Sequence, residues 1–181
     1  TLWALQEKGL CFSFTTDPCL KETINLTGNA IGYCIYMGIK CKVLTKATNW
    51  VDGFLREKEE NNYFDTENSK EVYCFGFTLT GHDELEPNAN TNQERIEAIK
   101  KLHNAGCTAF ASIEPIIDLK SSMDMIKQTI GYCDEYKIGL LSGDKTIKKN
   151  ELQKFFDEVN LLATTHNFNV YWKDSINNKL K

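Results

Sequence analysis

Residues 76–118 constrain the fold more than any other part of the sequence, because a strand, a loop, a helix and a strand follow one another there. The strand Val72–Thr80 is rich in aromatic and β-branched residues, as strands usually are. Thr91 or Asn92 can cap a helix whose apolar residues recur at helical spacing. A second apolar strand, Cys107–Ile113, follows. The stretch therefore predicts one βαβ unit with polar groups where its strands end.

The same alternation of strands and helices runs through the rest of the chain. Further strands are predicted at Leu10–Thr15, Lys40–Thr45, Tyr136–Leu141 and Asn169–Trp172. Further helices are predicted at Leu20–Met37, at Asn49–Glu59, from Ser121 or Ser122 to about Cys133, and at Lys149–Thr164. Residues 60–70 read as a loop, and the polar tail from Lys173 is expected to fray.

Strands separated by helices pair in parallel through right-handed crossovers, so the pattern predicts an α/β fold. At 181 residues the chain, residues 1–181, is expected to form a single domain. A closed barrel of eight units needs about 200–250 residues. This favours a partial TIM-like barrel with mostly parallel strands, with a doubly wound sheet as the alternative. The two common nucleotide-binding fingerprints, G-x-G-x-x-G and G-x-x-x-x-G-K-[ST], are missing.

The composition argues against several classes of function. Apolar residues make up 41% and charged residues 25% of the chain, as in soluble globular proteins. A net charge of −4 provides no basic surface, so nucleic acid is not an expected partner. No run reaches the ~18 apolar residues of a membrane span, so a membrane is not an expected partner either.

Seven cysteines are present, an odd number at irregular spacing, and none forms a C-x-x-C pair. Several fall within apolar strands or helices, where a free thiol packs as a small hydrophobic group. The pattern favours reduced thiols in a cytoplasmic protein over a disulfide framework. It predicts no metal site formed by these cysteines.

Polar side chains recur at the carboxyl ends of successive predicted strands, the edge that carries the active site in parallel barrels. Hydroxyl groups, carboxylates and one lysine at this edge could hold a polar, zwitterionic ligand through both of its charges. Taken singly, each residue is more often a turn former, a helix cap or a solvated side chain. The set comprises Thr15, Thr16, Asp17, Lys46, Thr78, Thr80, His82, Ser112, Glu114, Ser142 and Asp144.

Several segments, taken together and in order, resemble the radical SAM superfamily, and within it the branch similar to spore photoproduct lyase. They are FSFTTDP, VLTK, GFTLTGHDELEPNANTNQERIEAIKKLHNAG, FASIEPIID, YKIGLLSG and VYWKDS. The resemblance implies a partial (β/α)6 barrel that holds S-adenosylmethionine and a 4Fe–4S cluster. It also implies reductive cleavage of S-adenosylmethionine to a 5′-deoxyadenosyl radical, with the cofactors doing the chemistry.

The resemblance further implies roles for eight residues. Thr16 and Asp17 occupy the place of the family's Gly-Gly-Glu-type motif, which receives the methionine amino group. Lys46 is similar to a lysine that meets the methionine carboxylate. The remaining members of the set, which the resemblance places near the carboxylate, ribose or adenine, are Thr78, Thr80, Arg95, Ser112 and Glu114.

One departure from the family is large, because its cluster-binding C-x-x-x-C-x-x-C loop does not occur in this chain. The strand Leu10–Thr15 resembles the family's second strand, so we expect the first strand and its cluster loop to precede Thr1 in a longer enzyme, or to have been lost. The chain alone is then expected to bind no cluster and to be inactive. An unpaired Leu10–Thr15 would favour dimerisation, unless residues 1–9 cover it.

Two other interpretations stay open, and the substrate cannot be read from the sequence. A barrel enzyme of another class, such as an aldolase, could use Lys46 as a Schiff-base nucleophile. A non-catalytic binding module could keep the partial barrel as a scaffold. An upstream C-x-x-x-C-x-x-C loop would favour the radical SAM enzyme over the aldolase.

Overall fold

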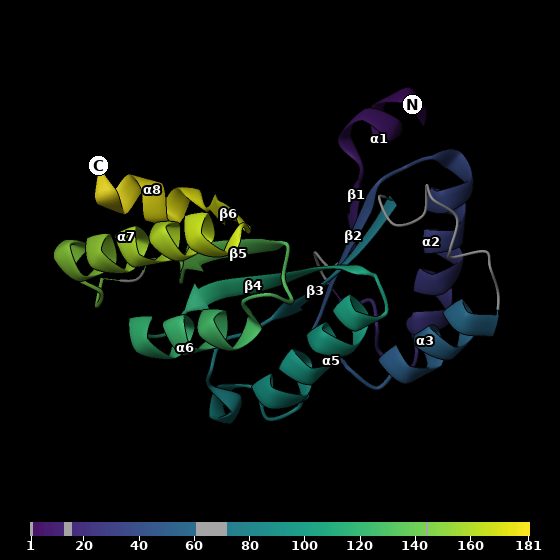
Figure 1. Cartoon of the computed structure of the whole chain (residues 1–181), viewed down its shortest axis with the longest axis horizontal. Helices are drawn as coiled ribbons and strands as arrows, with labels where there is room; N and C mark the ends of the chain where they lie inside the picture. The colour runs from purple at the N-terminus through teal and green to yellow at the C-terminus, as the bar shows by residue number, and fades with distance from the viewer. Residues whose placement is uncertain (1, 13–15, 61–71, 144) are drawn as a thin grey trace.

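The computed structural model contains a six-stranded parallel sheet with helices along its outer face (Figure 1). It describes residues 2–12, 16–60, 72–143 and 145–181. The strands are β1 (Leu10–Phe12), β2 (Cys41–Thr45), β3 (Tyr73–Thr78), β4 (Thr108–Ile116), β5 (Glu135–Leu140) and β6 (Asn169–Trp172). The helices are α1 (Leu2–Lys8), α2 (Ile24–Met37), α3 (Val51–Glu60), η2 (Asp83–Leu85), α5 (Asn92–Asn104), α6 (Leu119–Thr129), α7 (Lys149–His166) and α8 (Asp174–Leu180).

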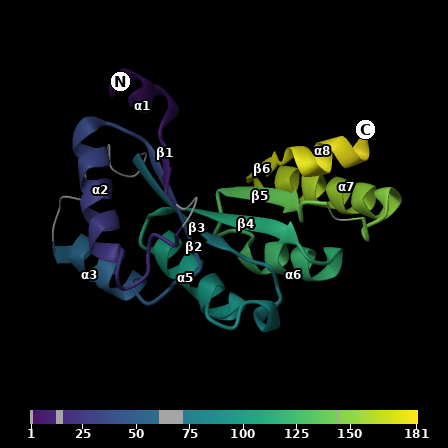
Figure 2. The same cartoon turned by 180° about the vertical axis from the view of Figure 1, so that it is seen from behind.

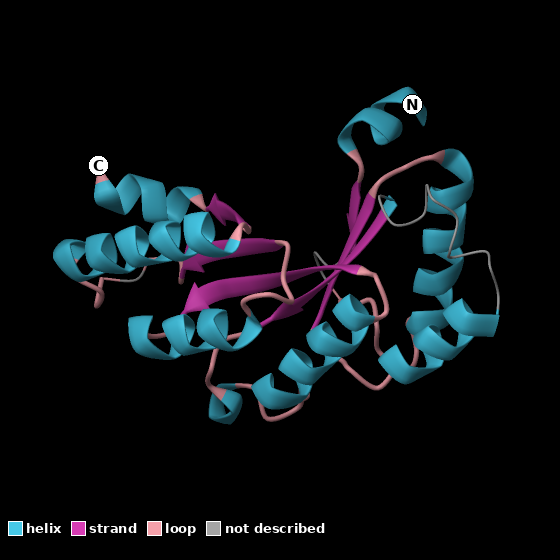
Figure 3. Cartoon of the chain, viewed as in Figure 1, coloured by secondary structure: helices cyan, strands magenta, loops and turns pink. Residues whose placement is uncertain are grey.

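The strands stand in the order of the chain, from β1 at one edge to β6 at the other, and each neighbouring pair is parallel. A doubly wound sheet would reverse its strand order partway across. An order without reversal, built from crossovers of one hand, places the connecting helices on a single face. Figures 2 and 3 show the connecting helices α2, α3, α5, α6 and α7 following that face. The predicted partial (β/α)6 TIM-like barrel is therefore confirmed.

Alternation along the strands separates a packed outer face from an open, concave inner face. On the outer face, the ring of Phe75 lies 4.8 Å from that of Trp50 and 4.9 Å from that of Phe54. Burial of large apolar side chains between sheet and helices is the main favourable term in folding. The outward residues that form the centre of this core include Val43, Tyr73, Phe75, Phe77, Ala109, Ala111, Ile113, Tyr136 and Ile138.

The strand β4 runs further than the sequence predicted, because it continues through Pro115 to Ile116. Its pairing with β5 shifts register between Ile113 and Ile116. A proline has no N–H for the ladder and is tolerated at such an irregularity. Glu114 therefore belongs to a strand of the sheet and not to the loop that follows it.

The predicted start of α2 was wrong, since the helix begins at Ile24 and not at Leu20, and so were both predicted boundaries of α6. Asp118, not Ser121 or Ser122, caps α6, and its carboxylate accepts the N–H of Ser121 at 2.8 Å. That helix ends at Thr129, well before Cys133. The cap was missed because Asp118, Ser121 and Ser122 stand close together, and both residue types cap helices.

The sequence predicted that the tail from Lys173 would fray, but the tail forms α8. Ile176 is completely buried, and the N–H of Leu140 donates to the Ser175 hydroxyl at 3.0 Å. Leu180, one turn further on, also packs against the core, but two apolar residues in a short polar segment are too weak a pattern to predict such a helix. Residues 2–8 form α1 beyond the amino end of β1 (Figure 1), and β1 is an edge of the described sheet, so dimerisation stays a prediction.

Some predictions lie outside the described residues: Thr15, Asp144 and all of the loop predicted at 60–70 except Glu60, which is the last residue of α3. In the part of the chain that is described, none of the helices has the length and apolar character needed to cross a bilayer.

Candidate functional site

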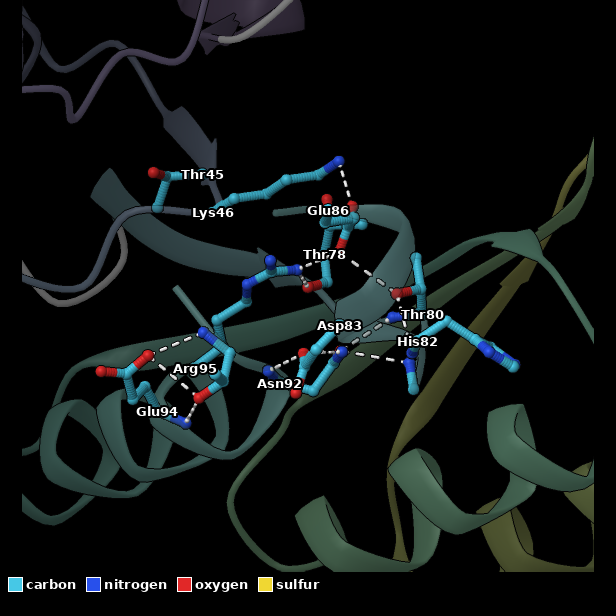
Figure 4. Close-up of polar contacts among 12 residues, drawn as sticks. Thr45, Lys46, Thr78, Thr80, His82, Asp83, Glu86, Asn92, Glu94 and Arg95 are labelled. Carbon is cyan, nitrogen blue, oxygen red and sulfur yellow. Dashed lines mark hydrogen bonds and ion pairs between the residues drawn. The ribbon is translucent and has the colours of Figure 1, made fainter. Parts of the chain in front are cut away.

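A network of charged side chains surrounds Glu86 at the carboxyl ends of β2 and β3 (Figure 4). One oxygen of this carboxylate, Oε1, forms an ion pair with the ammonium group of Lys46. The other, Oε2, lies 2.8 Å from Nη1 of Arg95 and accepts a hydrogen bond from the Thr80 hydroxyl at 3.2 Å. A single carboxylate, with its side chain 10% exposed, therefore joins the end of β2, the loop after β3, and α5.

Arg95 lies deepest in this network, and none of its side chain is exposed. Its Nη1 donates to the carbonyl oxygen of Thr78 at 2.9 Å as well as to Glu86. Its Nε and Nη2 are buried and have no hydrogen-bond partner among the described residues. An unsatisfied buried donor costs about 1–3 kcal/mol, so this guanidinium group has unused capacity for an acceptor.

Hydrogen bonds at the start of α5 hold these groups in place. Thr91, one of the two predicted caps, caps the helix in a capping box, in which its hydroxyl accepts the N–H of Glu94 and the Glu94 carboxylate accepts the N–H of Thr91. The Asn92 side-chain oxygen accepts the N–H of Thr80 at 2.9 Å, and Asp83 accepts both the N–H and the side-chain amide of Asn92 at 2.6 Å. The loop after β3 is thereby fixed to the helix that carries the arginine.

The carboxylate of Glu86 is stabilised in its ionised form. Burial alone would raise the pKa of Glu86, but hydrogen bonds from Lys46 and Arg95, together with their charges, hold it below its ordinary value. The group is therefore negatively charged at neutral pH, between two cations.

Asp17 joins the ends of β1 and β2. Its Oδ1 accepts from the Thr45 hydroxyl at 2.6 Å and from the N–H of Cys19 at 2.9 Å, and its Oδ2 accepts the N–H of Lys46 at 2.7 Å. Three of its acceptor positions are thus used inside the protein. The neighbouring Thr16 is exposed.

Asp17, Lys46 and Glu86 line one pocket of about 760 Å³, while Ser112 and Glu114 line another of about 810 Å³ on the inner face of the sheet. The expectation that Asp17, Lys46, Thr78, Ser112 and Glu114 share one concave face is met only in part. Thr78 connects the two groups, because its Cα is paired with that of Ser112 and its carbonyl binds the buried arginine. Contact of the eight predicted residues with a ligand stays a prediction.

His82 belongs to a separate cluster, and its ring points away from Glu86 in Figure 4. Its Nε2 lies 2.6 Å from Asp118 and 3.0 Å from the Ser121 hydroxyl, and its Nδ1 lies 2.6 Å from Glu84. Hydrogen bonds to Asp118 and then to Glu84 raise the pKa of His82 above its ordinary value. This histidine therefore links the loop after β3 to the first turn of α6.

Glu86 is the member of the site that the sequence did not reveal. The loop at residues 81–90 carries three acidic residues, and their spacing does not indicate which of them meets Lys46. Only the folded path of the loop brings that carboxylate between a strand end and a helix.

The cysteines in the described part of the chain are not arranged to hold a 4Fe–4S cluster. The described residues contain no group of three or more His, Cys, Asp or Glu side chains that could hold a metal ion. All seven cysteines are free thiols and five of them are buried. Cys34 and Cys41 are in hydrogen-bond contact with each other. Burial, for example, raises the pKa of Cys19 to about 12, which disfavours the thiolate that a metal needs.

No family model and no curated protein matches this chain. Among solved structures it is similar to Streptococcus suis SuiB bound to S-adenosylmethionine, with a TM-score of 0.59, 14% identity, and coverage of 87% of this chain and 37% of SuiB. It is also similar to SuiB bound to the precursor peptide SuiA, with a TM-score of 0.57, 14% identity, and coverage of 86% and 36%.

At this sequence identity the similarity to SuiB establishes a shared fold. That fold agrees with the partial barrel that the radical SAM resemblance implied. The similarity does not single out the branch of spore photoproduct lyase. This chain spans well under half of the length of SuiB.

Proposed function

We propose that this chain forms the S-adenosylmethionine-binding part of a radical SAM enzyme, with the ligand at the carboxyl ends of β1–β4. The observation that carries the proposal is the buried guanidinium group of Arg95, whose Nε and Nη2 have no acceptor in the part of the chain that the structure describes. It pairs with Glu86, which lines the pocket at the edge of the sheet where parallel barrels bind ligands. The shared fold with SuiB, a protein crystallised with S-adenosylmethionine, supports the choice of ligand.

The methionine part of S-adenosylmethionine is a zwitterion, and the site carries both signs of charge. Its carboxylate would bind Arg95 and Lys46, and its amino group would bind Glu86 or Asp17. The ion pair between Lys46 and Glu86 would open for this. Lys46 can move, because its side chain is 42% exposed and lies at the pocket wall.

The hydroxyl groups of Thr78 and Thr80 are suited to hydrogen bonds with a ribose or carboxylate. Ser112 and Glu114 line the neighbouring pocket, where the remainder of the ligand or the substrate would lie. Radical chemistry would come from the bound cofactors. The residues of this chain would bind S-adenosylmethionine, orient it and exclude water, and the cluster thiolates would come from outside the described residues.

The Schiff-base alternative fits the geometry less well. Lys46 is in contact with Glu86, so its amine would have to leave this ion pair and lose a proton before attacking a carbonyl group. A non-catalytic binding module remains the second candidate, since it would use the same site without turnover.

Isothermal titration calorimetry with S-adenosylmethionine tests the proposal. We expect one saturable site, weakened about tenfold or more by Lys46→Met, because a hydrogen bond to a charged group contributes about 1.5–3 kcal/mol. Lys101→Met is the matched control, since Lys101 lies on α5 and pairs with the exposed Asp52 at 2.7 Å. Absence of saturable binding, or equal loss in both variants, would contradict the proposal.

A further inference from the structure

The concave face of the sheet carries a second set of charges that the network around Glu86 does not use. Its pocket of about 810 Å³ has a wall of lysine and glutamate side chains from β2, β4, β5 and the end of β6. Three lysines and two glutamates give this pocket a positive excess, although the whole chain has a net charge of −4. They are Lys42, Lys137, Lys173, Glu114 and Glu135.

Two of the lysines have close carboxylate partners, one at each side of the pocket. Toward the amino ends of the strands, Lys42 Nζ lies 2.6 Å from Glu135 Oε2. Toward the carboxyl ends, Lys173 Nζ lies 3.0 Å from Glu114 Oε2. Lys137 stands between these two pairs, because on β5 it follows Glu135 by two residues on the same face of the strand.

Lys137 has no close anion of its own. In the described part of the chain, its one carboxylate neighbour within 4.0 Å is Glu135, at 3.9 Å, and that group already binds Lys42. The ammonium group lies 4.5 Å from the centre of the Phe110 ring, and 22% of the side chain is exposed. Burial, and then the charge of Lys42, lower the pKa of Lys137, as expected for an under-compensated cation.

Ser112 supplies an unused donor beside this cation. The Cα atoms of Ser112 and Lys137 are paired in the register of β4 and β5, and both residues line the pocket. Ser112 is 3% exposed, and its hydroxyl makes no hydrogen bond to any described residue. An ammonium group and a hydroxyl side by side can donate to the same anion.

We infer that Lys137 and Ser112 form a binding site for a carboxylate or phosphate group of the substrate. The completely buried ring of Phe110 lies beneath the ammonium group of Lys137 and would support it, and does not itself line the pocket. That the anion belongs to the substrate rests on the proposed function. The binding of an anion at Lys137 and Ser112 is independent of the proposed function, because no group of the network around Glu86 takes part in it.

Amide chemical shifts of the labelled chain, followed by NMR, test the site. Inorganic phosphate and acetate are titrated separately, with sodium chloride holding the ionic strength constant. We expect saturable shifts at the amides of Lys137 and Ser112, and the tighter of the two anions identifies the ligand group. Lys137→Met should weaken binding about tenfold or more, and Lys137→Arg should keep it. Lys127→Met, which removes an exposed lysine of α6 paired with Glu158, is the control and should bind as the unaltered chain does.

Two results would overturn the site: no saturable shift with either anion, or equal affinity in folded Lys137→Met and the unaltered chain. Circular dichroism shows whether each variant is folded. If Lys137→Met does not fold, Lys137→Arg still tests whether a positive charge at this position is sufficient for anion binding. A calorimetric titration with S-adenosylmethionine separates the two proposals. Anion binding in a chain that fails to bind S-adenosylmethionine would contradict the proposed function and support the anion site.

Discussion

Replacing Glu86 by Gln removes the charge on which the network depends. Gln keeps the size of the side chain and one acceptor oxygen, so the packing of the loop should persist. Lys46 can turn toward solvent, but Arg95 cannot, because none of its side chain is exposed. The variant therefore leaves a buried guanidinium group without a carboxylate.

The expected cost follows from this burial. Removing one partner of a buried ion pair costs about 3–5 kcal/mol. The amide oxygen of Gln can still accept from Nη1 of Arg95, which places Glu86→Gln at the lower end, about 3 kcal/mol. In a protein of this size the melting temperature should fall by about 6–12 °C.

Urea unfolding followed by circular dichroism measures the free energy of unfolding. Glu158→Gln is the matched control, because Glu158 pairs with Lys127 at 2.8 Å with both side chains about half exposed. Such a surface pair contributes about 0–1 kcal/mol. If Glu86→Gln lowers the free energy of unfolding no more than Glu158→Gln does, the network is not the buried charge cluster described above.

Two further predictions concern the sheet and the loop after β3. Gly76→Ala would place a Cβ 2.2 Å from the buried ring of Phe110 and should lower the free energy of unfolding by about 1–3 kcal/mol. Gly28→Ala, in α2, places its Cβ more than 4 Å from other described residues and should not lower it; urea unfolding compares the two variants. The raised pKa of His82 means that its contribution is complete below the ordinary value of 6.5 and is lost as pH rises through the folded-state pKa. The unaltered chain should therefore lose more stability than His82→Gln between about pH 6 and about pH 9, and equal losses would contradict the role of the histidine pair with Asp118.

The sheet could be predicted because its strands are apolar runs separated by amphipathic helices. All six strands are found near their predicted positions, and the order of the chain leads directly to a partial barrel. The helix α8 could not be predicted, since only Ile176 and Leu180 anchor an otherwise polar segment. The extension of β4 through Pro115 was missed because proline usually ends a strand in the interior of a sheet.

The candidate site was predictable in its location but not in its contacts. Residue types at strand ends identified Asp17, Lys46 and Thr80, because parallel strands end at one edge. Spacing in the sequence could not show that Asp17 binds the hydroxyl of Thr45 or that Glu86 meets Lys46. Both contacts depend on where a loop returns to the sheet, which local pattern does not encode.

A crystal structure of the chain with S-adenosylmethionine tests the central claim most directly. The account predicts the ligand at the carboxyl ends of β1–β4, with its carboxylate within hydrogen-bond distance of the Nε or Nη2 of Arg95 and its amino group near Glu86 or Asp17. A ligand bound elsewhere on the chain, with both nitrogen atoms of Arg95 still lacking an acceptor, would contradict it.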